Sequence, residues 1–106
     1  MIDLAKNKRC MNKEFLVCYD IADDKMRNKF FNRMKDLGLF NIQDSVFWGY
    51  LNSAEERAVY RELQKHTADD TDYGFIINVN LSKVVALSTV GYSSDDFPED
   101  IDYGTI

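Results

Sequence analysis

The chain is poor in the residues that build metal clusters, disulfide frameworks and glycine-rich phosphate loops. Its 106 residues include one histidine, two cysteines, one proline and five glycines. This set cannot assemble a zinc site of His and Cys within one chain, and two cysteines are too few for a disulfide scaffold. A nucleotide-binding fold is also disfavoured, because no glycine-rich phosphate loop is present.

Long apolar runs are missing as well. No segment approaches the roughly 18 uninterrupted apolar residues that a membrane span needs. The first ten residues contain Lys6, Lys8 and Arg9 but lead into no long apolar stretch, which disfavours a signal peptide. We therefore expect a cytoplasmic protein without a membrane partner, whose cysteines are reduced. Met11 precedes the first structured segment, and the sequence does not decide whether Met1 or Met11 is the native start.

The acidic excess is local rather than general. The net charge is −5, and residues 93–106 contain five acidic residues and no Lys or Arg. The remaining acidic and basic residues therefore balance, and the charge of the body is neutral. We expect three parts: a flexible arm over 1–13, one domain over 14–92, and an acidic tail over 93–106 that contains a possible edge strand at 101–106. The tail is interpreted either as solvated disorder or as a docking segment for a basic partner.

The first half of the domain predicts a buried strand followed by an amphipathic helix. The apolar run 15–19 is typical of a central strand covered on both faces, and Asp20 ends it. Asp23 or Asp24 would cap the helix that follows, and Gly38 would end it. One face of this helix is apolar, with spacings of 4, 4 and 3 residues: Met26, Phe30, Met34 and Leu37.

The second half predicts another helix between strands. A strand is expected at 46–51, and Ser53 with Glu56 forms a capping box that begins a helix ending near His66. His66 is expected to be exposed and non-catalytic. Alternation over 75–81 predicts a strand whose better-buried face holds Phe75 and Ile77. Residues 83–90 read as a further strand. The element order is β-α-β-α-β-β, or β-α-β-β-α-β if the last pieces pair differently.

The simplest architecture for these elements is an α+β, ferredoxin-like β-α-β-β-α-β sandwich, in which two helices cover one face of an antiparallel sheet. The uncovered face would be available to a second copy. Phe47, Trp48 and Tyr50 are more aromatic surface than such a sheet usually leaves to water. We therefore expect a homodimer that forms through the sheet, with these three residues at its interface.

Asp20 is the first candidate for chemistry. A carboxylate at the end of a buried strand is rigidly held and still reaches solvent, and Mg²⁺ is often bound by one or two carboxylates with waters and phosphates. In a two-fold dimer, two copies of Asp20 could converge on one ion. The alternative is that Asp20 only closes a turn or caps the helix.

Two basic rows are the second candidate. Lys25, Lys29 and Arg33 lie along the first predicted helix, and Arg57, Arg61 and Lys65 are spaced four apart on the second. Each row could follow a phosphate backbone. The alternative is that both rows are ordinary solvated helix faces.

A set of short motifs over residues 14–90 resembles a known family. They are Tyr19-Asp20-Ile21, Asp24-Lys25, Arg27, Lys29, Gly38, Gln43, Ser45-Val46-Phe47 and Gly49. Their order and spacing are similar to those of the CRISPR-associated protein Two family, small adaptation proteins found beside the integrase, CRISPR-associated protein One. Residues 1–13 and the acidic tail depart from the family pattern. The tail suits docking on the integrase better than binding of DNA.

The resemblance implies a homodimer that bridges two integrase dimers during spacer acquisition and holds the incoming nucleic acid, DNA or RNA. It also implies a divalent cation, Mg²⁺ or another, with Asp20 as metal ligand and catalytic residue and Phe47 near it across the dimer. Phosphate contacts would come from the basic residues of the first helix: Lys25, Arg27, Lys29 and Arg33.

Three interpretations follow. The first is a non-catalytic scaffold, and the second is a metal-dependent endonuclease that cleaves RNA or DNA through paired Asp20. The third is a ribonuclease like virulence-associated protein D, or another ferredoxin-like RNA-binding module.

Overall fold

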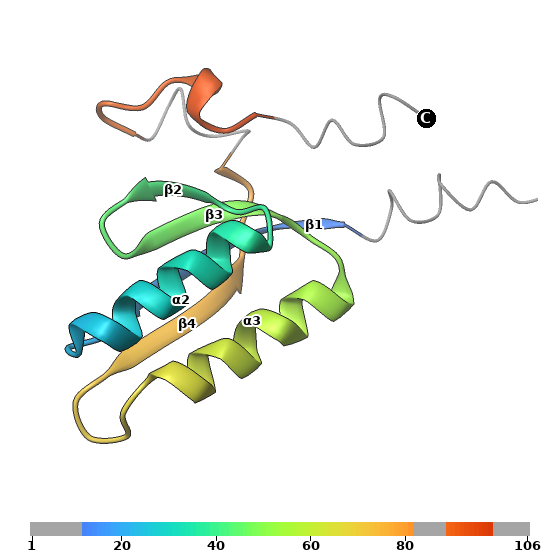
Figure 1. The fold of residues 1–106 in the computed structure, drawn as a ribbon. Helices are drawn as coiled ribbons and strands as arrows, with labels where there is room; N and C mark the ends of the chain where they lie inside the picture. Colours follow the sequence, from blue (N-terminus) through green and yellow to red (C-terminus); the bar gives the residue numbers. More distant parts are fainter. Residues whose placement is uncertain (1–11, 82–88, 99–106) are drawn as a thin grey trace, which may run out of the picture.

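The computed structural model describes residues 12–81 and 89–98. Its elements follow the order β-α-β-β-α-β and a short 3-10 helix comes after them (Figure 1). The elements are β1 (Lys13–Asp20), α2 (Asp24–Asp36), β2 (Phe40–Gln43), β3 (Val46–Leu51), α3 (Ser53–His66), β4 (Tyr73–Asn78) and the 3-10 helix η1 (Ser94–Asp96). The predicted arm at 1–13 and edge strand at 101–106 lie largely or wholly outside the described residues.

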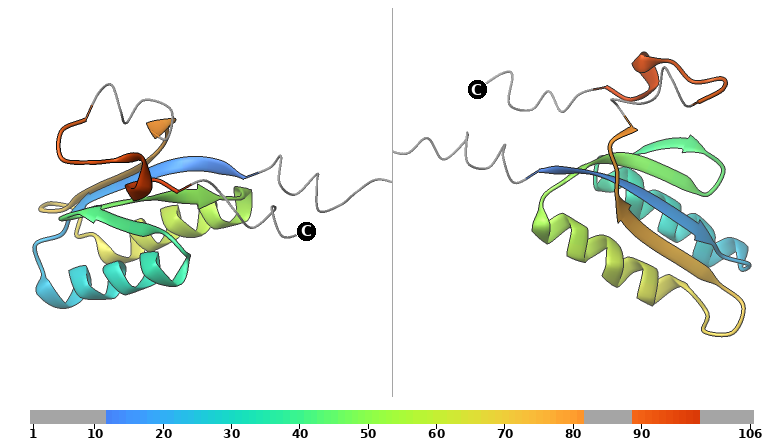
Figure 2. Two further views of the ribbon diagram at one scale, coloured as in Figure 1. Left: turned by 90° about the horizontal axis from the view of Figure 1, so that it is seen from above. Right: turned by 180° about the vertical axis from the view of Figure 1, so that it is seen from behind.

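The four strands form one antiparallel sheet in the order β2-β3-β1-β4. Both helices lie against the same face of this sheet, as the views from the front and from above show (Figures 1 and 2). This is the predicted ferredoxin-like α+β arrangement, and the second of the two predicted element orders is the one observed.

Strand β1 is an inner strand, paired with β3 on one side and with β4 on the other. Successive side chains of a strand point to opposite faces. Phe15, Val17 and Tyr19 are therefore directed to the helices, where they join the main core. Leu16 and Cys18 lie on the second face of the sheet and are only half-buried. The partial burial of Cys18 raises the pKa of its thiol.

Helix α2 forms as its sequence predicts. The side chain of Asp23 caps it by accepting a hydrogen bond from the Met26 amide at 2.9 Å. Phe30 and Met34 are fully buried against the sheet. Gly38 adopts a φ of +87°, a left-handed conformation that glycine tolerates best, and the chain turns there toward β2.

Two features of α3 differ from expectation. The capping box is formed by Asn52 and Glu55, one residue earlier than the predicted pair Ser53 and Glu56, since an asparagine side chain caps as well as a serine. His66 is buried, not exposed, because it faces the helix α2 side of the core. Its ring lies edge-on to Phe30, and its Nδ1 is 2.9 Å from the carbonyl oxygen of Glu62.

The strand predictions are right for β1 and β3 and less accurate elsewhere. Strand β2 was missed because Phe40–Gln43 is short and mixed in polarity. The prediction of which face of β4 is buried is wrong. Ile76 packs against the core, whereas Phe75 and Ile77 are about half exposed. Most of the strand predicted at 83–90 lies outside the described residues, and Thr89 and Val90 are not in a strand.

The beginning of the acidic tail packs on the second face of the sheet. Phe97 is buried against Trp48, with ring centroids 5.2 Å apart, and the Tyr92 hydroxyl donates to the Ile42 carbonyl oxygen at 3.0 Å. The tail segment passes over this face in the view from above (Figure 2). Residues 93–98 are therefore part of the folded unit, and the predicted boundary at 92 is too early.

Replacing Phe97 by Ala tests this packing. We expect the free energy of unfolding to fall by about 3 kcal/mol, because a buried aromatic side chain is lost. Phe40→Ala is the matched control, since Phe40 is half exposed; it should cost about 1 kcal/mol or less. Urea unfolding followed by Trp48 fluorescence measures both. Equal costs for the two variants would contradict the packing.

Candidate nucleic-acid and metal site

Asp20 ends β1 on the face of the sheet that the helices leave uncovered. Its side chain is exposed, and its register partner on β4 is Tyr73. Further along the same two strands, Cys18 pairs with Phe75 and Leu16 pairs with Ile77. Tyr73, Phe75 and Ile77 are 72%, 53% and 49% exposed in the single chain. Asp20 therefore stands at one end of an uncovered apolar strip.

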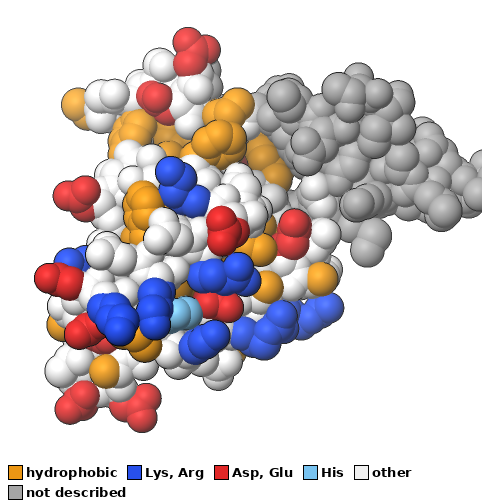
Figure 3. All heavy atoms as spheres, viewed as in Figure 1, with side chains coloured by type: hydrophobic (Ala, Val, Ile, Leu, Met, Phe, Trp, Pro, Cys, Tyr) orange, Lys and Arg blue, Asp and Glu red, His pale blue; other side chains and the backbone are white. Residues whose placement is uncertain are grey.

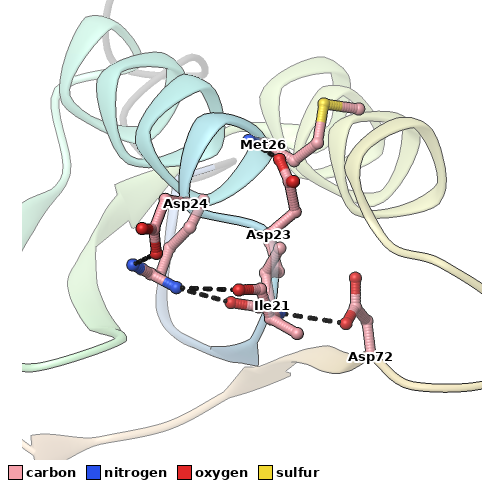
Figure 4. A network of polar contacts seen from close by, with 7 residues as sticks. Ile21, Asp23, Asp24, Met26 and Asp72 are labelled. Atoms are coloured by element: carbon pink, nitrogen blue, oxygen red, sulfur yellow. Dashed lines mark hydrogen bonds and ion pairs between the residues drawn. The ribbon is translucent and has the colours of Figure 1, made fainter.

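The turn that follows Asp20 is held from two sides, as Figure 4 shows. From α2, the Arg27 guanidinium donates to the carbonyl oxygens of Ile21 at 2.9 Å and Ala22 at 3.4 Å, and it is ion-paired with Asp24. From the α3–β4 loop, the Asp72 carboxylate accepts from the Ala22 amide at 3.0 Å. These contacts fix the backbone on which Asp20 stands.

Asp72 is a positioning residue that the sequence reasoning missed. Besides Ala22, it accepts from the Ala68 amide at 2.8 Å and the Thr71 hydroxyl at 3.1 Å. The backbone hydrogen bonds from Ala68 and Ala22 lower the pKa of Asp72, because they stabilise the ionised carboxylate. The only sequence signal was its place at the end of a polar loop, before a strand.

The four predicted phosphate contacts on α2 fall into two classes. Lys25 and Lys29 are exposed and form no ion pair with any described residue. Arg33 lies near two carboxylates, 3.6 Å from Glu62 and 3.5 Å from Asp36. A phosphate contact by Arg27 would have to compete with its bonds to the turn and to Asp24. Lys and Arg side chains gather in a band over the two helices (Figure 3).

The predicted dimer residues do not share one face. Phe47 is fully buried on the helix side, where it contacts Tyr19 and Phe31. The prediction that it lies at a sheet interface is therefore wrong for this fold, because neighbours in a strand point to opposite faces. Trp48 and Tyr50 do lie on the second face, but Trp48 is completely covered by Phe97 and other residues of the same chain.

Trp48 is anchored by a buried carboxylate. Its indole nitrogen donates to Glu14 Oε2 at 2.6 Å, and the Leu81 amide donates to the same oxygen at 2.6 Å. Glu14 is buried, so these bonds offset the cost of removing its carboxylate from water. Trp48 is therefore held inside the fold, whereas Tyr73, Phe75 and Ile77 of β4 remain exposed.

A metal site needs more ligands than one chain supplies at Asp20. Within residues 12–81 and 89–98, three or more His, Cys, Asp or Glu side chains are nowhere grouped as a metal site requires. Asp20 offers a hard oxygen ligand of the kind that Mg²⁺ accepts. The donor set fits a divalent cation only if a second copy or the phosphates of a substrate complete it.

Comparison with known proteins places the chain in a family. Residues 13–84 match the family described as CRISPR associated protein Cas2. The chain belongs to the Cas2 family. It is 35% identical over 96 residues to a CRISPR-associated endoribonuclease Cas2 of Francisella tularensis subsp. novicida, and the match covers 91% of this chain and 98% of that protein. A Cas2 endoribonuclease of Korarchaeum cryptofilum is 41% identical over 58% of this chain and 66% of its own length.

Solved structures agree with this fold. A crystal structure of Streptococcus pyogenes Cas2 superimposes with a TM-score of 0.61 and 22% identity, over 74% of this chain and 99% of that one; it supports the fold alone. The hypothetical protein TT1823 of Thermus thermophilus gives a TM-score of 0.59 and 30% identity, over 65% of this chain and 83% of its own. In the part of the chain that the structure describes, no helix has the length and apolar character of a membrane span.

The lowered pKa of Asp72 predicts a change in the acid stability of the fold. A carboxyl group whose pKa is lower in the folded state stabilises the fold above its unfolded pKa, near 3.8, and this stabilisation is lost as the pH falls through the lower folded value. Asp72→Asn should therefore reduce the stability difference between pH 5 and pH 2. Urea unfolding across this range measures it, with Asp70→Asn as the control. An unchanged pH dependence in Asp72→Asn would contradict the role given to its hydrogen bonds.

Proposed function

We propose that this chain acts in CRISPR adaptation, as a homodimer that bridges integrase dimers and holds nucleic acid during spacer acquisition. Membership of the Cas2 family carries this proposal, together with an exposed acidic residue at the end of the central strand. Cleavage of RNA or DNA by a metal bound at paired Asp20 residues is proposed as a second activity of the same dimer. The relatives named endoribonucleases support that second activity.

Binding of nucleic acid is assigned mainly to Lys25 and Lys29. Both amines are exposed on α2 and free of internal ion pairs among the described residues, so binding a phosphate costs them no existing contact. Arg33 would contribute less, because Asp36 and Glu62 already neutralise part of its charge. Lysine binds phosphate as a point charge and imposes no sequence preference.

The uncovered strip of the sheet supports pairing of Asp20 between two chains. Tyr73, Phe75 and Ile77 expose much of their apolar surface beside Asp20. A second copy that covers this strip about a two-fold axis would bring a second Asp20 near the first, since a symmetric interface duplicates every contact. Trp48 is already covered within the chain, so the interface is assigned to the β4 side rather than to β3.

A divalent cation held by the two Asp20 carboxylates would polarise a phosphodiester and lower the pKa of a bound water. The chain's own contribution is to hold Asp20 rigidly through the contacts that Arg27 and Asp72 make with the adjoining turn. One carboxylate per chain is a sparse catalytic set, so we propose the scaffold as the main role.

Substituting both Lys25 and Lys29 by Gln tests the nucleic-acid surface. Because each phosphate contact on duplex DNA contributes about 0.9 to the slope of log K against log salt, we expect the slope to fall by about two. Arg57→Gln with Arg61→Gln removes the same charge from α3 and should change the slope less. Fluorescence anisotropy with a labelled duplex from 50 to about 300 mM salt measures this. A larger effect from the α3 pair would contradict the assignment.

Substituting Asp20 by Asn separates the two activities. We expect metal-dependent cleavage to fall to the rate measured without metal, whereas spacer acquisition with the integrase should survive, because the scaffold surfaces are intact. Cleavage of labelled RNA and DNA with and without Mg²⁺, together with an acquisition assay, measures both. The matched control is Asp70→Asn, in the exposed α3–β4 loop. Loss of acquisition along with cleavage would contradict the scaffold as the main role.

A further inference from the structure

A cavity of about 280 Å³ lies on the helix side of the sheet, at the same end of β1 as Asp20. Its walls come from β1, from α2 and from the β2–β3 turn at Asp44 and Ser45. This volume is near the lower end of the range for ligand pockets, about 300–1,000 Å³. It leaves room only for a small ligand.

Tyr19 is the most buried of the residues that line this cavity. The residue is 6% exposed, and its amide donates to the Ser45 carbonyl oxygen at 3.1 Å, which ties the turn to the strand. Burial raises the pKa of the Tyr19 hydroxyl, with smaller opposing effects from the charges of Arg27 and Asp44. This hydroxyl is affected by the charges of Arg27 and Asp44, both of which line the cavity. It forms no hydrogen bond with another described residue.

The polar lining combines a carboxylate that only accepts, Asp44, with Asn28 and Ser45, whose side chains both donate and accept. The Asp44 side chain is exposed and has no ion pair or hydrogen bond with other described residues. The Asn41 amide nitrogen donates to the carbonyl oxygens of Gln43 and Val46, so its own side-chain oxygen remains an acceptor. Arg27 is the only cation in the lining, and it is occupied by Asp24 and the turn carbonyls. A free carboxylate and an occupied guanidinium disfavour a phosphate here and favour a neutral ligand that donates hydrogen bonds.

The remaining wall is the ring of Phe31, and the Lys35 ammonium nitrogen lies over this ring, 5.6 Å from its centroid. Phe31 lines the cavity, is half-buried, and packs edge-on against Phe47 with ring centroids 5.1 Å apart. An aromatic side chain beside hydrogen-bond acceptors is the usual way in which proteins bind an unpaired base, which stacks on the ring and bonds through its edge.

We propose that this cavity binds one unpaired nucleobase that carries an exocyclic amino group, with the Asp44 carboxylate as the acceptor for that group. The inference rests on the proposed nucleic-acid function and specifies it further. Tyr19 and Asp20 are adjacent in β1 and point to opposite faces, so a strand that passes around the end of the sheet would place a base in the cavity and a neighbouring phosphate near Asp20.

Cytosine and uracil provide the sharpest test, because they have the same ring size and differ in the amino or carbonyl group at position 4. Labelled oligo(C) and oligo(U) RNA of ten nucleotides would be titrated with the full chain in EDTA, which prevents metal-dependent cleavage. We expect oligo(C) to bind about tenfold more tightly, the size of a good contact between an acidic side chain and the cytosine amino group. Asp44→Asn should bring the ratio of the two dissociation constants close to one.

Loss of a negative charge strengthens the binding of both oligonucleotides alike. The ratio of their dissociation constants cancels this general effect. Asp70→Asn makes the same charge change away from the cavity and should leave the ratio unchanged. A ratio near one for the unsubstituted chain, or a ratio that Asp44→Asn leaves unchanged, would overturn the cavity's role while leaving nucleic-acid binding intact. Failure to bind either oligonucleotide, in a chain that still binds the labelled duplex, would overturn this inference and leave the proposed function standing.

Discussion

The alternation of side chains along β1 is the constraint on which the rest of the molecule depends. Because β1 is the inner strand between β3 and β4, its register with both neighbours is fixed over nearly its whole length. A slip by one residue would move every side chain to the opposite face. The same alternation sends Tyr19 into the helix-side core and leaves Asp20 on the other face, although the two residues are adjacent.

This division gives the end of β1 two chemically different sides. On one side, the turn after Asp20 is held by Arg27 and Asp72, and the carboxylate stands beside apolar side chains of β4 that remain exposed. On the other side, Tyr19 lies among polar lining residues and an aromatic ring. Phe97 of the tail covers Trp48 on the second face, whereas Phe40 of β2 and three side chains of β4 (Tyr73, Phe75 and Ile77) stay exposed in the single chain.

Much of this arrangement follows from sequence pattern, and the exceptions have physical reasons. The apolar run of β1 and the periodicity of α2 predict both elements, and they place Asp20 at the end of a strand. Phe47 could not be assigned to a face, since its strand is apolar on both faces and the pattern alone shows no alternation. The burial of Phe97 and the bonds of Asp72 are contacts between segments far apart in the chain, which local pattern does not encode.

The central claim is that two chains meet with their Asp20 residues together. Asp20→Cys, in a chain whose Cys10 and Cys18 are replaced by Ser, would be treated with a short bifunctional thiol crosslinker, with Asp70→Cys in the same background as the comparison. The account predicts a covalent dimer in high yield for the cysteine at position 20 and little for the one at position 70. The claim would be contradicted if the Asp20→Cys chain stayed monomeric, or if the Asp20→Cys and Asp70→Cys chains crosslinked with equal yield.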